Sequence, residues 1–140
     1  MKPEKPRITL CMIVKDETHV IERCLRSAAP FIDRYDITDT GSTDGTQDLI
    51  KKTMDELGVP GTVHQSDWKG FGDHNGQMGS RSESLRNAET SDCDFAWVID
   101  ADDSLESGEI IVPNDLSVDG YSVRIARGDF VWWRNQIFNL

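Results

Sequence analysis

Strand-like and helix-like segments alternate along this chain, and that order restricts its fold more than any other feature of the sequence. The first segment, Ile8–Val14, is apolar and rich in β-branched residues, as in a parallel strand that is covered on both faces. A stripe of apolar residues at helical spacing follows it and stops before Pro30. Alternation of this kind builds βαβ units with right-handed crossovers. We therefore expect an α/β fold with a Rossmann-like, mostly parallel sheet that is flanked by helices.

Two further helices and one loop are expected. A helix opens at Asp44, which is expected to form a capping box with Gln47, and it ends at Gly58. Another helix covers Ser80–Ala88, and the Gly-rich, polar stretch Trp68–Gly79 before it is expected to be an exposed loop. The remaining strands are expected over Tyr35–Thr40, Thr62–Ser66 and Phe95–Ile99, with a hairpin of Tyr121–Ile125 and Phe130–Trp133 at the end.

Length and charge narrow the class of protein and its partners. The 140 residues suit a single domain, which we place over residues 1–140. The 15 basic and 25 acidic residues give a net charge of −10, and such a chain repels nucleic acid and anionic membranes. No apolar stretch approaches the length of a membrane span, and neither the three cysteines nor His19, His64 and His74 have the spacing of a zinc motif. We expect a cytoplasmic protein with reduced thiols.

Polar clusters follow three of the expected strands. These clusters are Lys15–Glu17, Asp39–Thr46 and Asp100–Asp103. In open parallel sheets, ligands bind outside the carboxyl ends of the strands. The three clusters are therefore expected to meet at one edge of the sheet and to form a site there.

The last cluster has the chemistry of a metal site. Asp100 and Asp102 lie two residues apart after an apolar strand, and carboxylate oxygens are the ligands that Mg²⁺ and Mn²⁺ prefer. The alternative is an acidic loop without a ligand, because most charge runs are solvated surface. An EF-hand that starts at Asp100 is excluded, since Leu105 and Ile111 occupy the positions of its Gly and Glu.

The middle cluster joins a strand to a helix through a Gly-Ser-Thr-Asp-Gly turn. Such a turn presents backbone N–H groups and a helix N-terminus to an anionic or polar ligand. Asp39 stands at the strand end, where its carboxylate can accept hydrogen bonds from a base or a ribose, whereas Asp44 is better explained as a helix cap. The turn is not a P-loop, because no Gly-Lys-Ser/Thr triplet occurs.

Three motifs in this order resemble the nucleotide-sugar half of the family 2 glycosyltransferases of GT-A fold. They are Ile8–Glu17, Asp39–Thr46 and Val98–Asp103, and the similarity extends from about Ile8 to Asp103. The resemblance implies that the chain binds a nucleoside diphosphate sugar, with a UDP-sugar favoured, together with Mn²⁺ or Mg²⁺. It implies inverting transfer of the sugar to an acceptor that the sequence does not identify.

The resemblance also assigns residues to the donor site. In the family, the matching residues hold the nucleobase, and here they are Lys15, Asp16, Glu17 and Asp39, of which Asp16 replaces the usual Asn. Arg81 matches an arginine near the donor, although Ser82 stands where the family has Asn. Asp100 faces the ribose or the metal, and Asp102 binds the metal.

Family members are much longer than this chain, and their later half supplies the acceptor site and the catalytic base. We therefore expect a domain that is truncated at the C-terminus and lacks the acceptor-binding half, and we name no catalytic residue. The alternative to a transferase is a non-catalytic nucleotide-sugar-binding fragment.

Trp132 and Trp133 either stack on a sugar or, as we favour, form core or dimer contacts, so a homodimer is one of the possible partners. A phosphohydrolase that uses Asp100 as its nucleophile is disfavoured, because no Lys follows Lys69.

Overall fold

A six-stranded sheet forms the centre of the computed structural model, which describes residues 5–72, 76, 78–106, 115 and 117–140. The sheet order is β3-β2-β1-β4-β6-β5. The first four strands along the chain pair in parallel, whereas the last two form an antiparallel hairpin that joins the sheet beside β4. The expected mostly parallel sheet is confirmed. The strands are β1 (Ile8–Val14), β2 (Arg34–Asp39), β3 (Gly61–Gln65), β4 (Phe95–Val98), β5 (Gly120–Arg127) and β6 (Phe130–Asn139).

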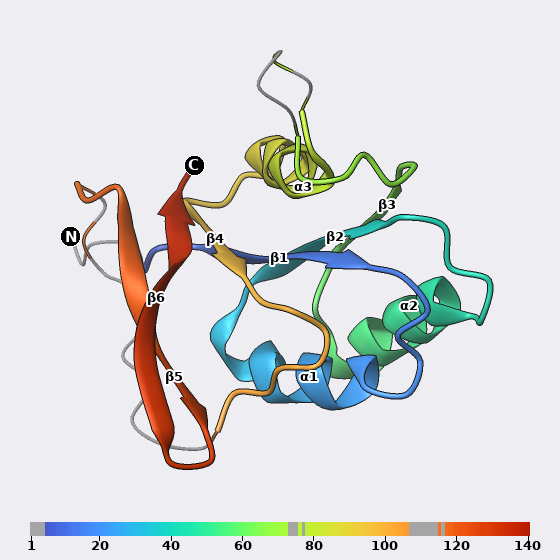
Figure 1. The fold of residues 1–140 in the computed structure, drawn as a ribbon, viewed down its shortest axis with the longest axis horizontal. Coiled ribbons are helices and arrows are strands. Elements are labelled where there is room, and N and C mark those ends of the chain that lie inside the picture. Colours follow the sequence, from blue (N-terminus) through green and yellow to red (C-terminus); the bar gives the residue numbers. More distant parts are fainter. Residues whose placement is uncertain (1–4, 73–75, 77, 107–114, 116) are drawn as a thin grey trace.

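Helices cover both faces of the sheet (Figure 1). On one face lie α1 (Ile21–Ala28) and α2 (Thr46–Leu57), and on the other lies α3 (Ser80–Glu89). A short 3-10 helix, Ala29–Phe31, ends the first crossover where the sequence places Pro30. Among the described residues, none of the helices combines the length and the apolarity that crossing a bilayer requires.

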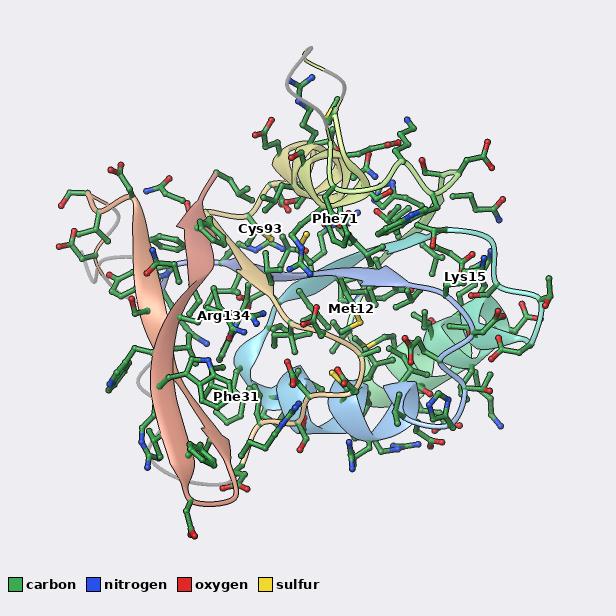
Figure 2. The ribbon with its side chains drawn as sticks, viewed as in Figure 1. Met12, Lys15, Phe31, Phe71, Cys93 and Arg134 are labelled. Carbon is green, nitrogen blue, oxygen red and sulfur yellow. The ribbon has the colours of Figure 1, made fainter. Side chains whose placement is uncertain are left out.

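The larger apolar core lies between the sheet and the α1–α2 layer. Met12 of β1 points into this layer (Figure 2), together with Ile37 of β2 and Leu25 of α1, and all three side chains are buried. A smaller cluster around Cys11 and Ala88 lies under α3. Because β1 is covered on both faces, its sequence is apolar nearly throughout instead of alternating.

Two of the expected local features are wrong. Asp44 and Gln47 do not form a capping box at the start of α2. The N-cap residue is Gly45, with a φ of 91°. The Gln47 Oε1 accepts a hydrogen bond from the Gln65 Nε2 at 2.9 Å instead. Trp132 and Trp133 are not core residues, since 41% and 68% of their surfaces are exposed on the hairpin.

Asp44 nevertheless organises the start of α2. Its Oδ1 accepts hydrogen bonds from the backbone N–H of Thr46 at 3.0 Å and from the Thr46 hydroxyl at 2.5 Å, and its Oδ2 accepts one from the Thr18 hydroxyl at 2.9 Å. The bond from the Thr46 hydroxyl is the largest influence, and together these donors lower the pKa of Asp44 from 3.8 to about 2. The carboxylate thus ties the turn before α1 to the start of α2.

This bonding predicts a loss of stability in acid. A carboxyl whose pKa is lower in the folded chain stabilises it above the unfolded value, and the contribution disappears as the pH falls from about 4 to about 2. We expect the melting temperature of the native chain to fall more steeply over this range than that of Asp44→Asn. Asp48→Asn, which removes the same charge from the first turn of α2, is expected to keep the native slope. If the melting temperatures of the native chain and of Asp44→Asn fall equally with pH, the role of Asp44 is contradicted.

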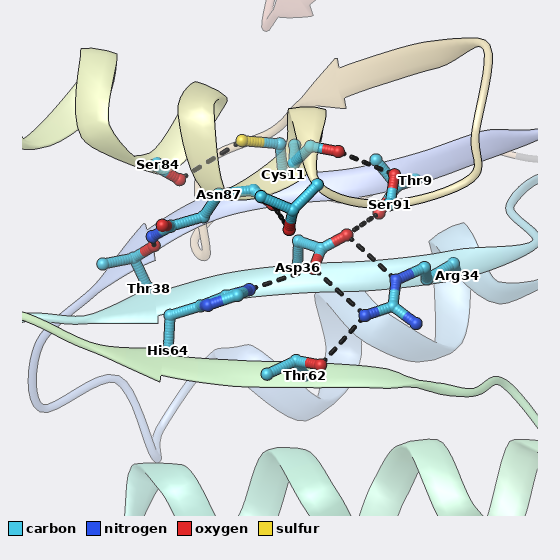
Figure 3. Close-up of polar contacts among 12 residues, drawn as sticks. Thr9, Cys11, Arg34, Asp36, Thr38, Thr62, His64, Ser84, Asn87 and Ser91 are labelled. Carbon is cyan, nitrogen blue, oxygen red and sulfur yellow. Dashed lines mark hydrogen bonds and ion pairs between the residues drawn. The ribbon is translucent and has the colours of Figure 1, made fainter. Parts of the chain in front are cut away.

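A buried polar cluster joins the first three strands (Figure 3). Asp36 of β2 is fully buried, and its carboxylate accepts hydrogen bonds from the Thr9 hydroxyl at 2.7 Å and the Arg34 Nε at 3.2 Å. The His64 Nε2 lies 3.0 Å from its other oxygen. The Arg34 Nη2 also donates to the Thr62 hydroxyl at 2.9 Å, so the cluster spans β1, β2 and β3. Asp36 was not predicted as part of such a cluster, because a lone Asp within an apolar strand belongs to no motif.

Candidate functional site

A hollow of about 440 Å³ lies at the carboxyl ends of β1, β2 and β4, where the sequence predicted a site. One side of it is formed by β1 and the turn that follows, and another by α3 and the segment that precedes it. Its polar wall contains two cationic side chains and one carboxylate, and its apolar wall contains two large aromatic rings. The lining residues are Ile13, Val14, Lys15, Thr40, Trp68, Gly70, Phe71, Arg81 and Asp100.

Three carboxylates converge beside this hollow after β4. One oxygen from each of Asp100, Asp102 and Asp103 lies within 4.8 Å of the others. Burial raises the pKa of Asp103, and repulsion from Asp100 and Asp102 raises it further. Hard oxygen donors that repel one another suit a divalent cation, because the cation offsets their charge. The donor set therefore fits Mg²⁺ or Mn²⁺, as the sequence predicted for Asp100 and Asp102.

Two arginines face Asp100 from different elements. The Arg81 Nη2 of α3 lies 3.4 Å from the Asp100 Oδ1, and the Arg134 Nη2 of β6 lies 3.5 Å from the Asp100 Oδ2. All three side chains are partly exposed, so each ion pair is weak in water. Arg81 was predicted from the sequence, and Arg134 was not.

The turn after β1 places Lys15 at the hollow (Figure 2) but gives its neighbours other contacts. Asp16 has a φ of 52°, a region that Asn and Asp tolerate better than most residues. Its Oδ1 accepts a hydrogen bond from the Thr43 N–H at 2.8 Å, and its own N–H donates to the Ser42 hydroxyl at 2.8 Å. Asp16 therefore joins the turn after β1 to the turn after β2, and it does not line the hollow.

Glu17 also lies beside the hollow and not in it. Its N–H donates to the Thr46 hydroxyl at 2.9 Å. Burial raises the pKa of the Glu17 carboxyl; His19 lowers it, and the nearby charges of Asp102 and Asp44 raise it further. Glu17 thus adds an acidic side chain near the group formed by Asp100, Asp102 and Asp103.

Asp39 ends β2 with one carboxylate oxygen bonded and the other free. Its Oδ1 accepts hydrogen bonds from the N–H groups of Gly41 at 2.9 Å and Ser42 at 2.8 Å. Burial acts to raise the pKa of Asp39, but the hydrogen bonds from Ser42 and Gly41, together with the nearby Gln47 side chain, outweigh it and lower the pKa. The Oδ2 is buried and finds no hydrogen-bond partner in the part of the chain that the structure describes. A buried charged oxygen without a donor is costly, and a ligand N–H or O–H would satisfy it.

The aromatic wall of the hollow comes from the loop before α3. Trp68 and Phe71 are 53% and 91% exposed, and their rings meet edge to face with centroids 5.7 Å apart. The expected exposed loop is confirmed for Trp68 to Gly72, but its aromatic pair was missed as a site feature. Two large rings three residues apart in a Gly-rich, polar stretch were the available signal. Position 74, a histidine in the sequence, lies outside the described residues.

The structure brings most of the predicted site residues together. Lys15, Arg81 and Asp100 line the hollow, and Asp102 lies next to Asp100. The additional residues are Thr40, which lies in the second motif but was given no role, and Trp68, Phe71 and Arg134, which belong to none of the three motifs. All three cysteines are free, and burial raises the pKa of Cys11 to about 11 and that of Cys24 to about 12.

Comparison with known proteins identifies the architecture. The crystal structure of S. aureus TarS 1–349 superposes with a TM-score of 0.53 at 19% identity, over 70% of this chain and 28% of that one. TarS 1–349 in complex with UDP gives a TM-score of 0.51 at 18% identity, over 69% of this chain and 27% of that one. The chain has a GT-A-like fold. The GT-A-like resemblance expected from the sequence is confirmed at the level of the fold, without the family 2 assignment.

Sequence comparison adds one relative. A TPR repeat-containing protein of Synechococcus elongatus is 30% identical over 99 residues, which cover 71% of this chain and 21% of that protein. No family model matches the chain. The chain thus spans about a fifth of this relative and about a quarter of TarS 1–349, and within that span it contains the GT-A-like sheet with its site.

Proposed function

We propose that this chain binds the nucleoside diphosphate part of a sugar donor, with a divalent cation, as the donor domain of a glycosyltransferase. The observation that carries the proposal is the acidic group Asp100, Asp102 and Asp103 at the rim of the hollow that also contains Lys15 and Arg81. A diphosphate needs positive charge, which a chain of net charge −10 does not supply over most of its surface. The complex of TarS with UDP supports a uridine nucleotide.

Each wall of the site has a separate task in this proposal. Lys15 and Arg81 bind diphosphate oxygens through charge-assisted hydrogen bonds. Asp100 and Asp102 hold the cation, which when bound supplies the positive charge that makes the diphosphate a better leaving group. The free Asp39 Oδ2 accepts a hydrogen bond from the base or the ribose.

The reaction that we propose is transfer of the sugar to a hydroxyl acceptor with inversion at the anomeric carbon. The acceptor hydroxyl must lose its proton to a base, and we assign no residue of this chain to that task. Donor binding without transfer is therefore the second candidate function. It needs only the groups that the hollow already presents, Lys15 and Arg81 beside the acidic group after β4.

Calorimetric titration of UDP into the chain tests the proposal directly. We expect saturable binding in Mn²⁺ and at least tenfold weaker binding in EDTA, since one or two carboxylates plus phosphate oxygens are the usual ligands in nucleotide sites of this kind. Equal affinity under both conditions would refute the metal role. UDP-glucose turnover without added acceptor, followed through UDP release, separates slow hydrolysis from binding alone.

Asp39→Asn tests the base or ribose contact without a change of shape. The Asn Oδ1 can still accept from Gly41 and Ser42, but the free acceptor becomes an N–H donor. Because a mispaired buried polar group costs about 1–3 kcal/mol, we expect uridine and UDP affinities to fall together by about tenfold or more. Asp48→Asn on the exposed side of α2 is the control and is expected to bind both as the native chain does. A loss confined to UDP would show that Asp39 does not contact the nucleoside.

A further inference from the structure

Arg134 reaches the site through strand pairing. β6 runs antiparallel to β4 with Ile137 opposite Trp97. Asp100 lies three residues after Trp97 and Arg134 lies three residues before Ile137, and the Arg134 Nη2 is 3.5 Å from the Asp100 Oδ2. The pairing of β4 with β6 therefore brings Arg134 close to the turn that follows β4.

A β-bulge turns Arg134 toward the site. The pairing of β5 with β6 shifts between Tyr121 and Ser122, so that Gln136 is the extra residue on β6. Without this residue, the alternation of side chains along a strand would put Arg134 and the buried Ile137 on opposite faces of the hairpin. With it, Arg134 points to the inner side of the hairpin (Figure 2), and its partner Val123 packs on the core. Bulges of this kind commonly redirect a side chain beside a functional site.

Asp100 is held between two guanidinium groups. Arg81 occupies its Oδ1 and Arg134 its Oδ2, at distances near the limit of a hydrogen bond. Asp100 also offers one of these oxygens to the group of three that would hold a divalent cation. A cation and two guanidinium groups repel one another, so they cannot all share this carboxylate at low cost.

We propose that Arg134 exchanges partners when the donor binds, leaving Asp100 to the cation and taking oxygens of the nucleoside diphosphate. The inference rests on the proposed function and adds a residue to it. A planar guanidinium binds phosphate oxygens in pairs, which makes arginine well suited to a diphosphate. The weak, partly exposed ion pair to Asp100 keeps Arg134 in place without the donor and costs little to break.

Arg134→Gln distinguishes this exchange from a purely structural contact. We expect its affinity for Mn²⁺ alone to rise by about two- to fivefold, because a competing cation has left Asp100. We expect its affinity for UDP in saturating Mn²⁺ to fall by about tenfold or more, because a charge-assisted contact to the diphosphate is lost. Both affinities are measured by calorimetry on the whole chain.

Arg124→Gln is the matched control for charge. Arg124 is exposed on β5 of the same hairpin, opposite Trp133, and its replacement changes the net charge by the same amount. A general effect of charge would move Mn²⁺ and UDP affinities in the same directions as the exchange does. We expect Arg124→Gln to change neither affinity by more than about twofold, since exposed charges outside contact distance are screened.

The outcomes separate the two proposals. Native-like UDP binding by Arg134→Gln would overturn the exchange and leave the proposed function intact. A fall in both affinities would show that Arg134 only supports the shape of the site and would also overturn the exchange. Absence of manganese-dependent UDP binding by the native chain would overturn the proposed function and the exchange with it. If Arg134→Gln does not fold, Arg134→Lys decides: we expect several-fold weaker UDP binding, and native affinity would contradict recognition by the guanidinium.

Discussion

Replacing Asp102 by Asn is expected to weaken manganese-dependent UDP binding by about 100-fold. Asp102 supplies one of the three carboxylate oxygens that lie within 4.8 Å of one another after β4. Asn keeps the size of the side chain but replaces a charged ligand with a neutral one, and loss of a ligand is expected to cost at least as much as loss of its supporting contacts, which is about 10- to 100-fold. The measurement is calorimetric titration of UDP at fixed Mn²⁺.

Asp129→Asn is the control for this experiment. Asp129 is exposed in the turn between β5 and β6, so its replacement removes one acidic charge away from the group after β4. We expect its affinity for UDP to lie within about twofold of that of the native chain, because an exposed charge outside the site is screened by salt. A native affinity for UDP in Asp102→Asn would remove Asp102 from the metal site and would leave Asp100 and Asp103 to be tested in the same way.

The largest effect on stability is expected at Asp36. Asp36→Ala leaves the Arg34 guanidinium, the Thr9 hydroxyl and the His64 ring without their common acceptor under α3. Removing one partner of a buried ion pair costs about 3–5 kcal/mol. We expect the lower part of that range, since Arg34 is partly exposed and can turn toward water. Urea unfolding, followed by circular dichroism, measures the change.

A double-mutant cycle shows how much of this loss belongs to the ion pair. If Arg34 and Asp36 stabilise the fold through each other, Arg34→Ala should cost much less in the Asp36→Ala background than in the native chain. Asp67→Ala, an exposed acidic residue in the loop after β3, is expected to change the free energy of unfolding by no more than about 0.5 kcal/mol. Additive losses at Arg34 and Asp36 would contradict the coupling.

Local patterns were sufficient for most of the elements. The apolar run of β1, the end of α2 at Gly58 and the turn at Gly128 were all predicted from residues next to one another in sequence. The start of α2 was predicted wrongly because Asp44 and Gln47 bond to other segments, and a cap motif cannot show which partner is nearer in space. The tryptophans of the hairpin were assigned to core or dimer contacts, and the core part is wrong because hydrophobicity does not show which part of a strand extends beyond the sheet.

The candidate site divides in the same way. Lys15, Arg81, Asp100 and Asp102 could be predicted because each belongs to a short motif at the end of a strand or the start of a helix. The sequence by itself thus determined the mostly parallel sheet, the edge at which the hollow lies and the acidic group after β4.

Only the tertiary structure decided which other side chains face that edge. Arg134 lies 34 positions after Asp100 in the sequence, and the register of β4 with β6 together with one bulge brings the two side chains into contact. Asp16 was predicted to bind the donor, but the folded chain uses its carboxylate to hold Thr43. Pairing register and hydrogen-bond partners depend on segments far apart in the chain, and for that reason no local pattern contains them.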